Sequence, residues 1–111
     1  MKTIEHFVGG KILSGDSKRT SKVFNPATGE QSAEVKLAST KDVNQAVENA
    51  KKAFEPWANT PPLQRARIMF KFKELIEENS DELTKIIVAE HGKVYEDARG
   101  SLTRGDRKSV V

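Results

Sequence analysis

The chain has 111 residues, of which 36% are hydrophobic and 32% are charged, and this length allows one small domain or a part of a larger one. Its net charge of +3, with acidic residues interspersed among the basic ones, argues against a nucleic-acid-binding protein. Cysteine is absent, which excludes disulfides, thiolate metal sites and thiol catalysis within this polypeptide; no apolar run fits a membrane span or a signal peptide, so we expect a cytoplasmic protein with no membrane partner.

Residues 1–37 have the pattern of short strands joined by turns. The stretch 7–12 predicts a hairpin with Gly9-Gly10 as its turn, and the polar stretch 14–21 predicts a loop. A second hairpin is predicted around Asn25-Pro26, which favours a turn, with Gly29 supplying a positive φ. The apolar residues after this turn alternate with polar ones, as in a half-buried strand; they are Ala33, Val35 and Leu37.

Residues 39–104 have the periodicity of helices. The first helix begins at Ser39 or Thr40, with Asp42 placed three residues after Ser39 as in a capping box with a shorter acid. Pro56 marks the end of this helix. Its apolar residues recur at spacings of three and four, and Trp57 is expected to pack on the next helix; they are Val43, Ala46, Val47, Ala50, Phe54 and Trp57.

Three further helical stretches follow. Thr60 and the two prolines after it begin the second helix, because proline is tolerated where backbone N–H groups lack partners. Ser80 is expected to cap the third helix, which Gly92 ends, and the fourth runs over residues 94–104. The apolar residues expected to face inward are Ile68, Met69, Phe72, Leu75, Ile76, Leu83, Ile86, Ile87, Val94, Ala98 and Leu102.

These elements predict an α+β chain, with N-terminal β-hairpins followed by an antiparallel cluster of three to four helices. The parallel-strand crossovers of an α/β enzyme are missing from the pattern, and residues 106–111 fit no element. Two hairpins alone are marginal in water. We therefore expect the apolar stripes of the helices to be partly exposed, with dye binding or aggregation as the sign.

Few side chains suggest chemistry. His6 and His91 lack the spacing of a metal motif, and Gly9-Gly10 is not followed by a phosphate-loop pattern, so neither a metal site nor a cofactor-binding site is expected. The acidic residues at 77–82 are expected at a solvated helix junction. Arg104 remains as a candidate, because its guanidinium can hold a carboxylate bidentately and the glycine after it allows close approach.

Several short motifs together resemble the aldehyde dehydrogenase superfamily. Each motif is weak alone, but their order and spacing over residues 5–105 are specific. Within the superfamily the chain looks most like the CoA-acylating methylmalonate-semialdehyde dehydrogenases. The motifs are His6 to Lys11, Phe24 to Glu30, Ala46 to Ala50 with Ala53, Phe54 and Trp57, Arg65 to Met69, Glu90 to Lys93, Asp97 to Gly100, and Arg104-Gly105.

The resemblance implies that residues 1–105 are the N-terminal part of the NAD-binding domain of an α/β enzyme. In the intact family, a cysteine thiolate attacks the aldehyde, hydride passes to NAD and CoA takes the acyl group. The implied substrates are malonate and methylmalonate semialdehyde, in valine or inositol catabolism, and the implied assembly is a homo-oligomer. By position, Arg104 would be the substrate-binding residue that holds the carboxylate of the semialdehyde.

The chain departs from the family in its length and in its last residues. It lacks the cysteine and the NAD site, so we expect a fragment that has no catalytic residue, holds no cofactor and is inactive by itself. Residues 106–111 diverge from the family, and an out-of-frame tail or a truncated gene explains them. Three alternatives stay open: a non-catalytic interaction module that acts alone or pairs with a separately encoded enzyme remainder, another aldehyde dehydrogenase subfamily, and a small nucleic-acid binder that uses the basic residues of 99–108.

Overall fold

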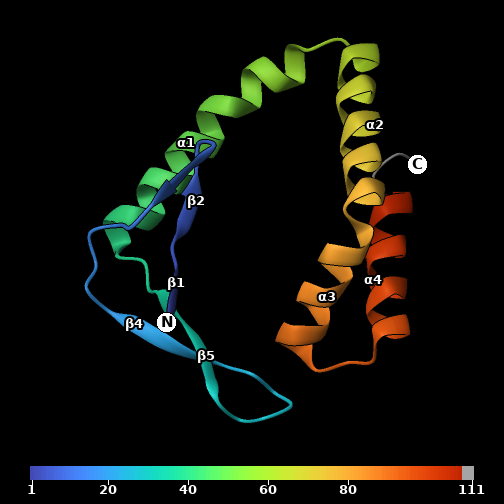
Figure 1. Ribbon diagram of the computed structural model, residues 1–111. Coiled ribbons are helices and arrows are strands. Elements are labelled where there is room, and N and C mark those ends of the chain that lie inside the picture. Colours follow the sequence, from blue (N-terminus) through green and yellow to red (C-terminus); the bar gives the residue numbers. More distant parts are fainter. Residues whose placement is uncertain (109–111) are drawn as a thin grey trace. The chain divides into compact units, whose positions relative to one another are not determined.

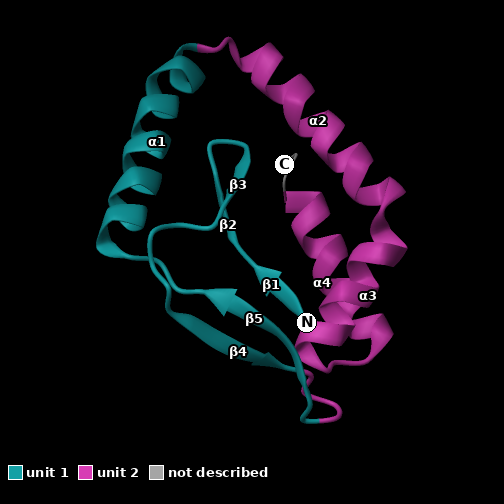
Figure 2. Ribbon diagram, turned by 60° about the vertical axis from the view of Figure 1, so that its left-hand side comes forward, with its two compact units in different colours: residues 1–24, 29–59 teal, residues 25–28, 60–111 magenta. Residues whose placement is uncertain are grey.

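The computed structural model describes residues 1–108. The chain forms two compact units (Figure 2). The first comprises residues 1–24 and 29–59, and the second comprises residues 25–28 together with the chain from Thr60 onwards.

The first unit contains a three-stranded sheet made of β1 (Lys2–Ile4), β4 (Thr20–Phe24) and β5 (Gln31–Lys36), with β5 in the centre (Figure 1). The strands β4 and β5 are antiparallel, with Val23 opposite Ala33, which confirms the second predicted hairpin. Ala33 is buried, with 6% of its surface exposed. The strand β1 pairs with β5 in parallel. The sequence did not predict this pair, because three residues are too few for a two-residue alternation to be recognised.

A separate hairpin in the first unit joins β2 (His6–Val8) to β3 (Lys11–Leu13). Gly9 and Gly10 connect the two strands with φ of +60° and +76°. Two successive positive φ angles belong to the turn whose twist matches that of the flanking strands, and glycine adopts them without steric cost. The predicted Gly-Gly hairpin is therefore confirmed.

The first unit ends with the helix α1 (Thr40–Asn59). Pro56 lies inside this helix, so the prediction that the helix ends there is wrong. Proline removes one backbone donor, but the residues that follow still complete the last turn. Several apolar side chains of α1 are more than half exposed, including Phe54 at 73% and Val47 at 57%. The packing of Trp57, which is 42% exposed, on the next helix stays a prediction.

The second unit contains the helices α2 (Pro62–Glu78), α3 (Ser80–His91) and α4 (Tyr95–Lys108). Pro62 is the first residue of α2, as predicted. Ser80 does not cap α3; Asn79 occupies the cap position without a side-chain cap bond, and its side chain donates to the Leu75 carbonyl at 2.8 Å. Because only one residue separates α2 from α3, Ser80 already has helical backbone geometry, and no free start remains for its hydroxyl to cap.

Gly92 ends α3, as predicted. Its φ is +80°, and its backbone N–H donates to the Val88 carbonyl at 2.9 Å. A β-carbon at this position would lie 3.0 Å from Cγ of Pro26, which belongs to the same unit. Gly92 is thus fixed both by its left-handed backbone and by the lack of space beside it.

The packing of α3 on α4 supplies the buried centre of the second unit. Ala98 and Thr84 are fully buried, and the Thr84 hydroxyl donates to the Ser80 carbonyl at 2.6 Å. Ile86, expected to face inward, is 47% exposed. Leu83 and Ile87 are half-buried, so this apolar stripe is partly exposed, like that of α2.

The helix α4 continues through Lys108, so the prediction that residues from 106 onwards fit no element is wrong for 106–108; residues 109–111 lie outside the described residues. Asp106 is buried, with 8% of its surface exposed. Glycine at 105 weakens a helix without ending it, and Arg107 and Lys108 interact favourably with the C-terminal dipole. In residues 1–108, no helix is long and apolar enough to cross a membrane.

The apolar stripes of the helices are partly exposed, as expected. Leu63 and Ile68 on α2 are 63% and 53% exposed, and Phe72 and Leu75 are 49% and 44% exposed. These apolar side chains keep contact with water.

Candidate functional site

Arg104, the candidate from the sequence, lies on an exposed face of α4. Its Nη2 donates to the Ser101 hydroxyl at 3.2 Å. Its Nη1 lies 3.5 Å from the point where a β-carbon of Gly100 would be, so the guanidinium extends back along the helix over a glycine. The side chain therefore has a defined position, set by one hydrogen bond and one small residue.

Lys93 brings a second positive charge to the same place. It lies in the connection between α3 and α4, and its ammonium group donates to the Ser101 hydroxyl at 3.0 Å. Lys93 is half-buried, whereas Arg104 is exposed. The Ser101 hydroxyl itself donates to the Asp97 carbonyl at 3.2 Å, one turn back in α4. We call Lys93, Ser101 and Arg104 the cation cluster.

The cation cluster is open to an anion. In residues 1–108, no carboxylate lies within ion-pairing distance of Lys93 or Arg104. An ammonium group has three donors and a guanidinium has five, and the described contacts with Ser101 use one of each. The remaining donors and the two charges suit a carboxylate or a similar anion.

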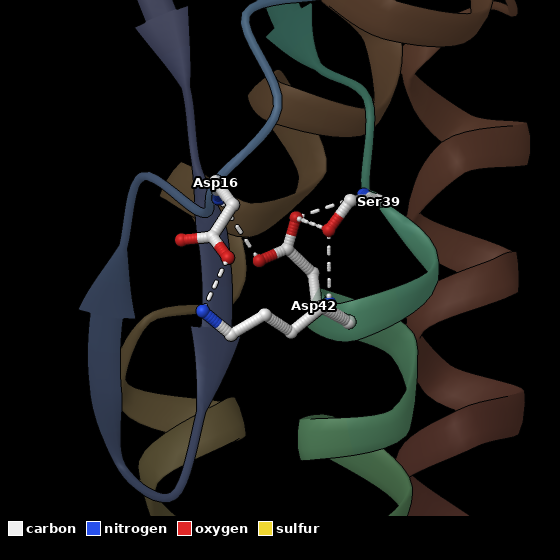
Figure 3. A network of polar contacts seen from close by, with 4 residues as sticks. Asp16, Ser39 and Asp42 are labelled. Carbon is white, nitrogen blue, oxygen red and sulfur yellow. Dashed lines mark hydrogen bonds and ion pairs between the residues drawn. The ribbon is translucent and has the colours of Figure 1, made fainter.

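Asp42 has a carboxylate that accepts several hydrogen bonds within the first unit (Figure 3). It accepts from the Ser39 backbone N–H and from the Ser39 hydroxyl, both at 2.8 Å, and from the Asp16 backbone N–H at 3.0 Å. The Asp42 N–H donates back to the Ser39 hydroxyl at 3.1 Å, which confirms the predicted capping box. The Ser39 backbone donor, then its hydroxyl and the Asp16 N–H, lower the pKa of Asp42 to about 2.

A groove of about 560 Å³ lies next to this network, between the β2–β3 hairpin and α1 of the first unit. Its lining is mainly apolar, with Phe7, Val8 and Val43 among the residues. His6 also lines it, and the Nε2 atom of His6 is buried without a hydrogen-bond partner in the described structure. Two carboxylates line the groove: Asp42 accepts from Ser39 and from the Asp16 N–H, and the carboxylate of Asp16 pairs with Lys41 at 2.7 Å.

The other polar residues considered in the sequence have structural surroundings. His91 lies in the last turn of α3, where a cation interacts well with the helix dipole. In the acidic stretch 77–82, Glu77 pairs with Lys73, and Asp81 pairs with Lys85 at 2.7 Å and accepts from the Tyr95 hydroxyl at 2.8 Å. These are solvated surface pairs, as expected from the sequence.

Neither a metal nor a dinucleotide has a recognisable site in the described part of the chain. Residues 1–108 contain no cluster of three potential metal ligands. The one strand that leads directly into a helix is β5, and the connection to α1 is Leu37-Ala38-Ser39. This connection has no glycine to let a backbone approach a pyrophosphate, so it does not fit the phosphate-binding turn of a dinucleotide site.

Sequence reasoning missed Lys93 and Ser101. Lys93 is one of many lysines, and it lies before α4, so the periodicity of that helix does not relate it to Ser101. Both became relevant only because the connection after Gly92 folds the lysine back onto α4. The signal that the sequence did offer is Arg104 at three residues after Ser101, which places the two on one helix face.

The chain is similar to known proteins along nearly its whole length. The sequence profile described as the aldehyde dehydrogenase family matches residues 12–107. Malonate-semialdehyde dehydrogenase of Pseudomonas aeruginosa is 44% identical over 105 residues, which cover 95% of this chain and 21% of that protein. This chain thus spans about a fifth of the length of the curated relatives that it matches.

Solved structures agree with these sequence matches. Methylmalonate-semialdehyde dehydrogenase from Oceanimonas doudoroffii is 50% identical, with a TM-score of 0.93 over 98% of this chain and 22% of that one. A putative methylmalonate-semialdehyde dehydrogenase from Sinorhizobium meliloti, solved with NAD, is 45% identical, with a TM-score of 0.94 and the same coverage. An NAD-dependent benzaldehyde dehydrogenase from Corynebacterium glutamicum is 35% identical, with a TM-score of 0.89 over 96% of this chain and 23% of that one.

Proposed function

Since the chain belongs to the aldehyde dehydrogenase family, we propose that it is a partial-length member of the NAD-dependent, CoA-acylating malonate- and methylmalonate-semialdehyde dehydrogenases. The family assignment, the α+β architecture and the partial coverage expected from the sequence are all confirmed. The identities of 44% and 50% to enzymes named for malonate and methylmalonate semialdehyde support this substrate class. The reaction converts the aldehyde, NAD⁺ and CoA to an acyl-CoA thioester, NADH and a proton.

Residues 1–105 form, in this proposal, the N-terminal part of the NAD-binding domain of a cytoplasmic, homo-oligomeric enzyme. NAD would supply the hydride acceptor and CoA the acyl acceptor, while this segment contributes scaffold and substrate contact. The observation that carries the proposal is the exposed Arg104, which shares the cation cluster with Lys93 and has no carboxylate of residues 1–108 within ion-pairing distance.

Arg104 would hold the carboxylate at the end of the semialdehyde opposite the reacting carbonyl. A charge-assisted hydrogen bond contributes about 1.5–3 kcal/mol, and more when the guanidinium binds both oxygens. An uncharged aldehyde of the same length gains none of this. Arg104 therefore would select malonate semialdehyde over propanal without touching the reacting atoms.

The 111-residue chain by itself should be inactive. The family reaction requires a thiolate, and this sequence has no cysteine. We expect no NADH absorbance when the purified chain is mixed with methylmalonate semialdehyde, NAD⁺ and CoA. Turnover by the purified chain would contradict this part of the proposal.

A chimeric enzyme tests the substrate class and the role of Arg104. In the Pseudomonas aeruginosa malonate-semialdehyde dehydrogenase, the matching segment is replaced by residues 5–105 of this chain, and NADH formation is followed with malonate semialdehyde and with propanal. Arg104→Gln should lower kcat/KM for malonate semialdehyde by about 10- to 100-fold. The same variant should leave the value for propanal nearly unchanged.

Two results would reject the proposal. One is an active chimera in which Arg104→Gln lowers kcat/KM equally for both aldehydes, since the arginine would then be structural. The other is a chimera that folds with native cofactor binding but prefers propanal, since the substrate class would then be wrong. Arg99→Gln, which removes one charge from an exposed position of α4 outside the cation cluster, is the matched control and should change neither value.

A second candidate function follows from the exposed apolar side chains. Phe7 and Ile12 in the first unit are 75% and 71% exposed, and Leu63 in the second is 63% exposed. Such surfaces indicate a missing contact, so the chain could act as an interaction module that pairs with a separately encoded remainder of the enzyme. Co-expression with a relative's remaining sequence should then restore NADH formation and reduce binding of an apolar dye. Unchanged dye binding and no copurification would exclude this function.

A further inference from the structure

We propose that Lys93 is a second cation of the carboxylate site, and that Ser101 is the positioning residue that holds it beside Arg104. This inference rests on the proposed function, because it assigns a further specificity-determining residue to the same substrate. It goes beyond the sequence pattern, in which only Arg104 had a suggested role.

The Ser101 hydroxyl joins the two cations through hydrogen bonds. Its oxygen accepts from Lys93 at 3.0 Å and from Arg104 at 3.2 Å, and its proton goes to the Asp97 carbonyl at 3.2 Å. A hydroxyl offers one donor and two acceptor positions, so all of them are in use. Ser101 therefore has no capacity left for a ligand, and its effect on binding must pass through the two cations.

The positive charges of Lys93 and Arg104 lie close to each other in the cation cluster. Two like charges that bond the same oxygen repel each other, and partial burial of Lys93 reduces the screening by water. In residues 1–108, no carboxylate within ion-pairing distance offsets this repulsion. An anion between the two cations would relieve it, which gives the cluster a larger gain from anion binding than a lone arginine has.

Lys93 and Arg104 both keep N–H donors that do not bond to Ser101. Lys93 comes from the connection before α4 and Arg104 from the third turn of α4, so the two cations approach Ser101 from different parts of the chain. A carboxylate has two oxygens with about four acceptor positions. One oxygen can accept from the guanidinium while the other accepts from the ammonium group, which fixes the orientation of the substrate's carboxylate.

Space around the cluster supports the same role. The guanidinium of Arg104 lies over Gly100, with Nη1 at 3.5 Å from the position of an added β-carbon. This separation is an ordinary van der Waals contact, so the guanidinium packs against the helix surface at Gly100. The site thus combines an arginine and a lysine that are both bonded to Ser101, and its ligand class is a short carboxylate such as malonate or its semialdehyde.

The test is a titration of the complete ¹⁵N-labelled 111-residue chain with malonate at constant ionic strength, followed by amide chemical shifts. We expect saturable shifts confined to residues 93–104. Lys93→Gln and Arg104→Gln should each raise the apparent Kd for malonate by about tenfold, because each removes a charge-assisted hydrogen bond. Arg99→Gln, which also removes one positive charge from α4, should change the Kd by less than twofold.

Ser101 is tested without a change of charge. Ser101→Ala should weaken malonate binding by about fivefold, because each cation then loses its hydrogen bond to the hydroxyl and regains side-chain freedom. Ser101→Thr keeps the hydroxyl and should restore binding to within twofold of the original chain. A purely structural role of Ser101 would not produce this rescue in a variant whose amide spectrum is otherwise unchanged.

The outcomes separate this inference from the proposed function. Weaker binding in Arg104→Gln together with unchanged binding in Lys93→Gln overturns the inference and leaves the role of Arg104 intact. Equal effects of Lys93→Gln, Arg104→Gln and Arg99→Gln, or the absence of saturable shifts, overturn the inference because the cluster then binds anions only through net charge. The substrate class is judged independently by the chimeric enzyme.

Discussion

Gly92→Ala is the substitution for which the structure gives the clearest energetic expectation. Gly92 has a φ of +80°, and a non-glycine residue in the left-handed region costs about 1–2 kcal/mol. The added β-carbon would also lie 3.0 Å from Cγ and 3.3 Å from Cβ of Pro26, which is inside the optimum carbon–carbon separation of about 3.5–4.0 Å. We therefore expect the free energy of unfolding to fall by about 1–3 kcal/mol.

The assay is urea unfolding followed by circular dichroism at 222 nm, with Gly105→Ala as the matched control. Gly105 lies inside α4, and an added β-carbon there meets no atom within 4 Å. The same chemical change should stabilise the chain by about 0.5–1 kcal/mol at this position. A second variant, Pro26→Ala in the Gly92→Ala background, removes the 3.0 Å contact with Cγ but keeps the 3.3 Å contact with Cβ, so it should recover part of the steric loss and none of the backbone part.

The essential result is that Gly92→Ala lowers the free energy of unfolding whereas Gly105→Ala raises it. If Gly92→Ala were as stable as the original chain, the left-handed cap and the contact with Pro26 would both be wrong. If both glycine substitutions stabilised the chain equally, the end of α3 would not lie at Gly92.

Two further predictions concern titration. The pKa of Asp42 is lowered from 3.8 to about 2 by its hydrogen bonds with Ser39 and Asp16. The contribution of Asp42 to stability is therefore present above pH 3.8 and is lost as the pH falls towards 2. Asp42→Asn should remove this part of the acid transition in a circular dichroism titration, and an unchanged transition would refute the assignment. The pKa of Tyr95 is raised above 10.0 by the Asp81 carboxylate that accepts from its hydroxyl. The contribution of this hydrogen bond to stability is therefore present below pH 10.0 and is lost as the pH rises through the folded-state pKa. Asp81→Asn should shift the absorbance titration of Tyr95 at 295 nm to lower pH, and a shift to higher pH would contradict the pairing.

The local parts of the fold could be predicted from the sequence because short-range chemistry determines them. Two adjacent glycines specify the turn at residues 9–10, and Gly92 specifies the end of α3. Ser39 and Asp42 specify the start of α1 through a reciprocal pair of hydrogen bonds. In each case the residues that decide the structure are within a few positions of one another.

The features that depend on distant residues were not predictable in the same way. The strand β1 forms because it pairs with β5, about thirty residues later, and a pattern over three residues carries no information about that partner. The start of α3 at Ser80 rather than after it depends on the direct succession of α2 and α3.

Only part of the candidate site could likewise be predicted from the sequence. Arg104 could be selected from the sequence because of its chemistry and its position in the family. Lys93 and Ser101 could not, because the connection after Gly92 has to fold before the lysine reaches the serine. The role of Arg104 as a substrate-binding residue and the interpretation of residues 106–111 as a divergent tail stay predictions.

The assignment of residues 25–28 to the second unit has a consequence for dissecting the chain. The second unit is discontinuous along the polypeptide, since one short piece of it comes from the turn between β4 and β5 and the rest begins at Thr60. Cleavage at residue 60 would therefore not release a complete helical unit; it would leave Gly92 without Pro26. A linear cut cannot separate the two units, whereas a circularly permuted chain or a two-chain mixture that retains residues 20–36 keeps the second unit whole.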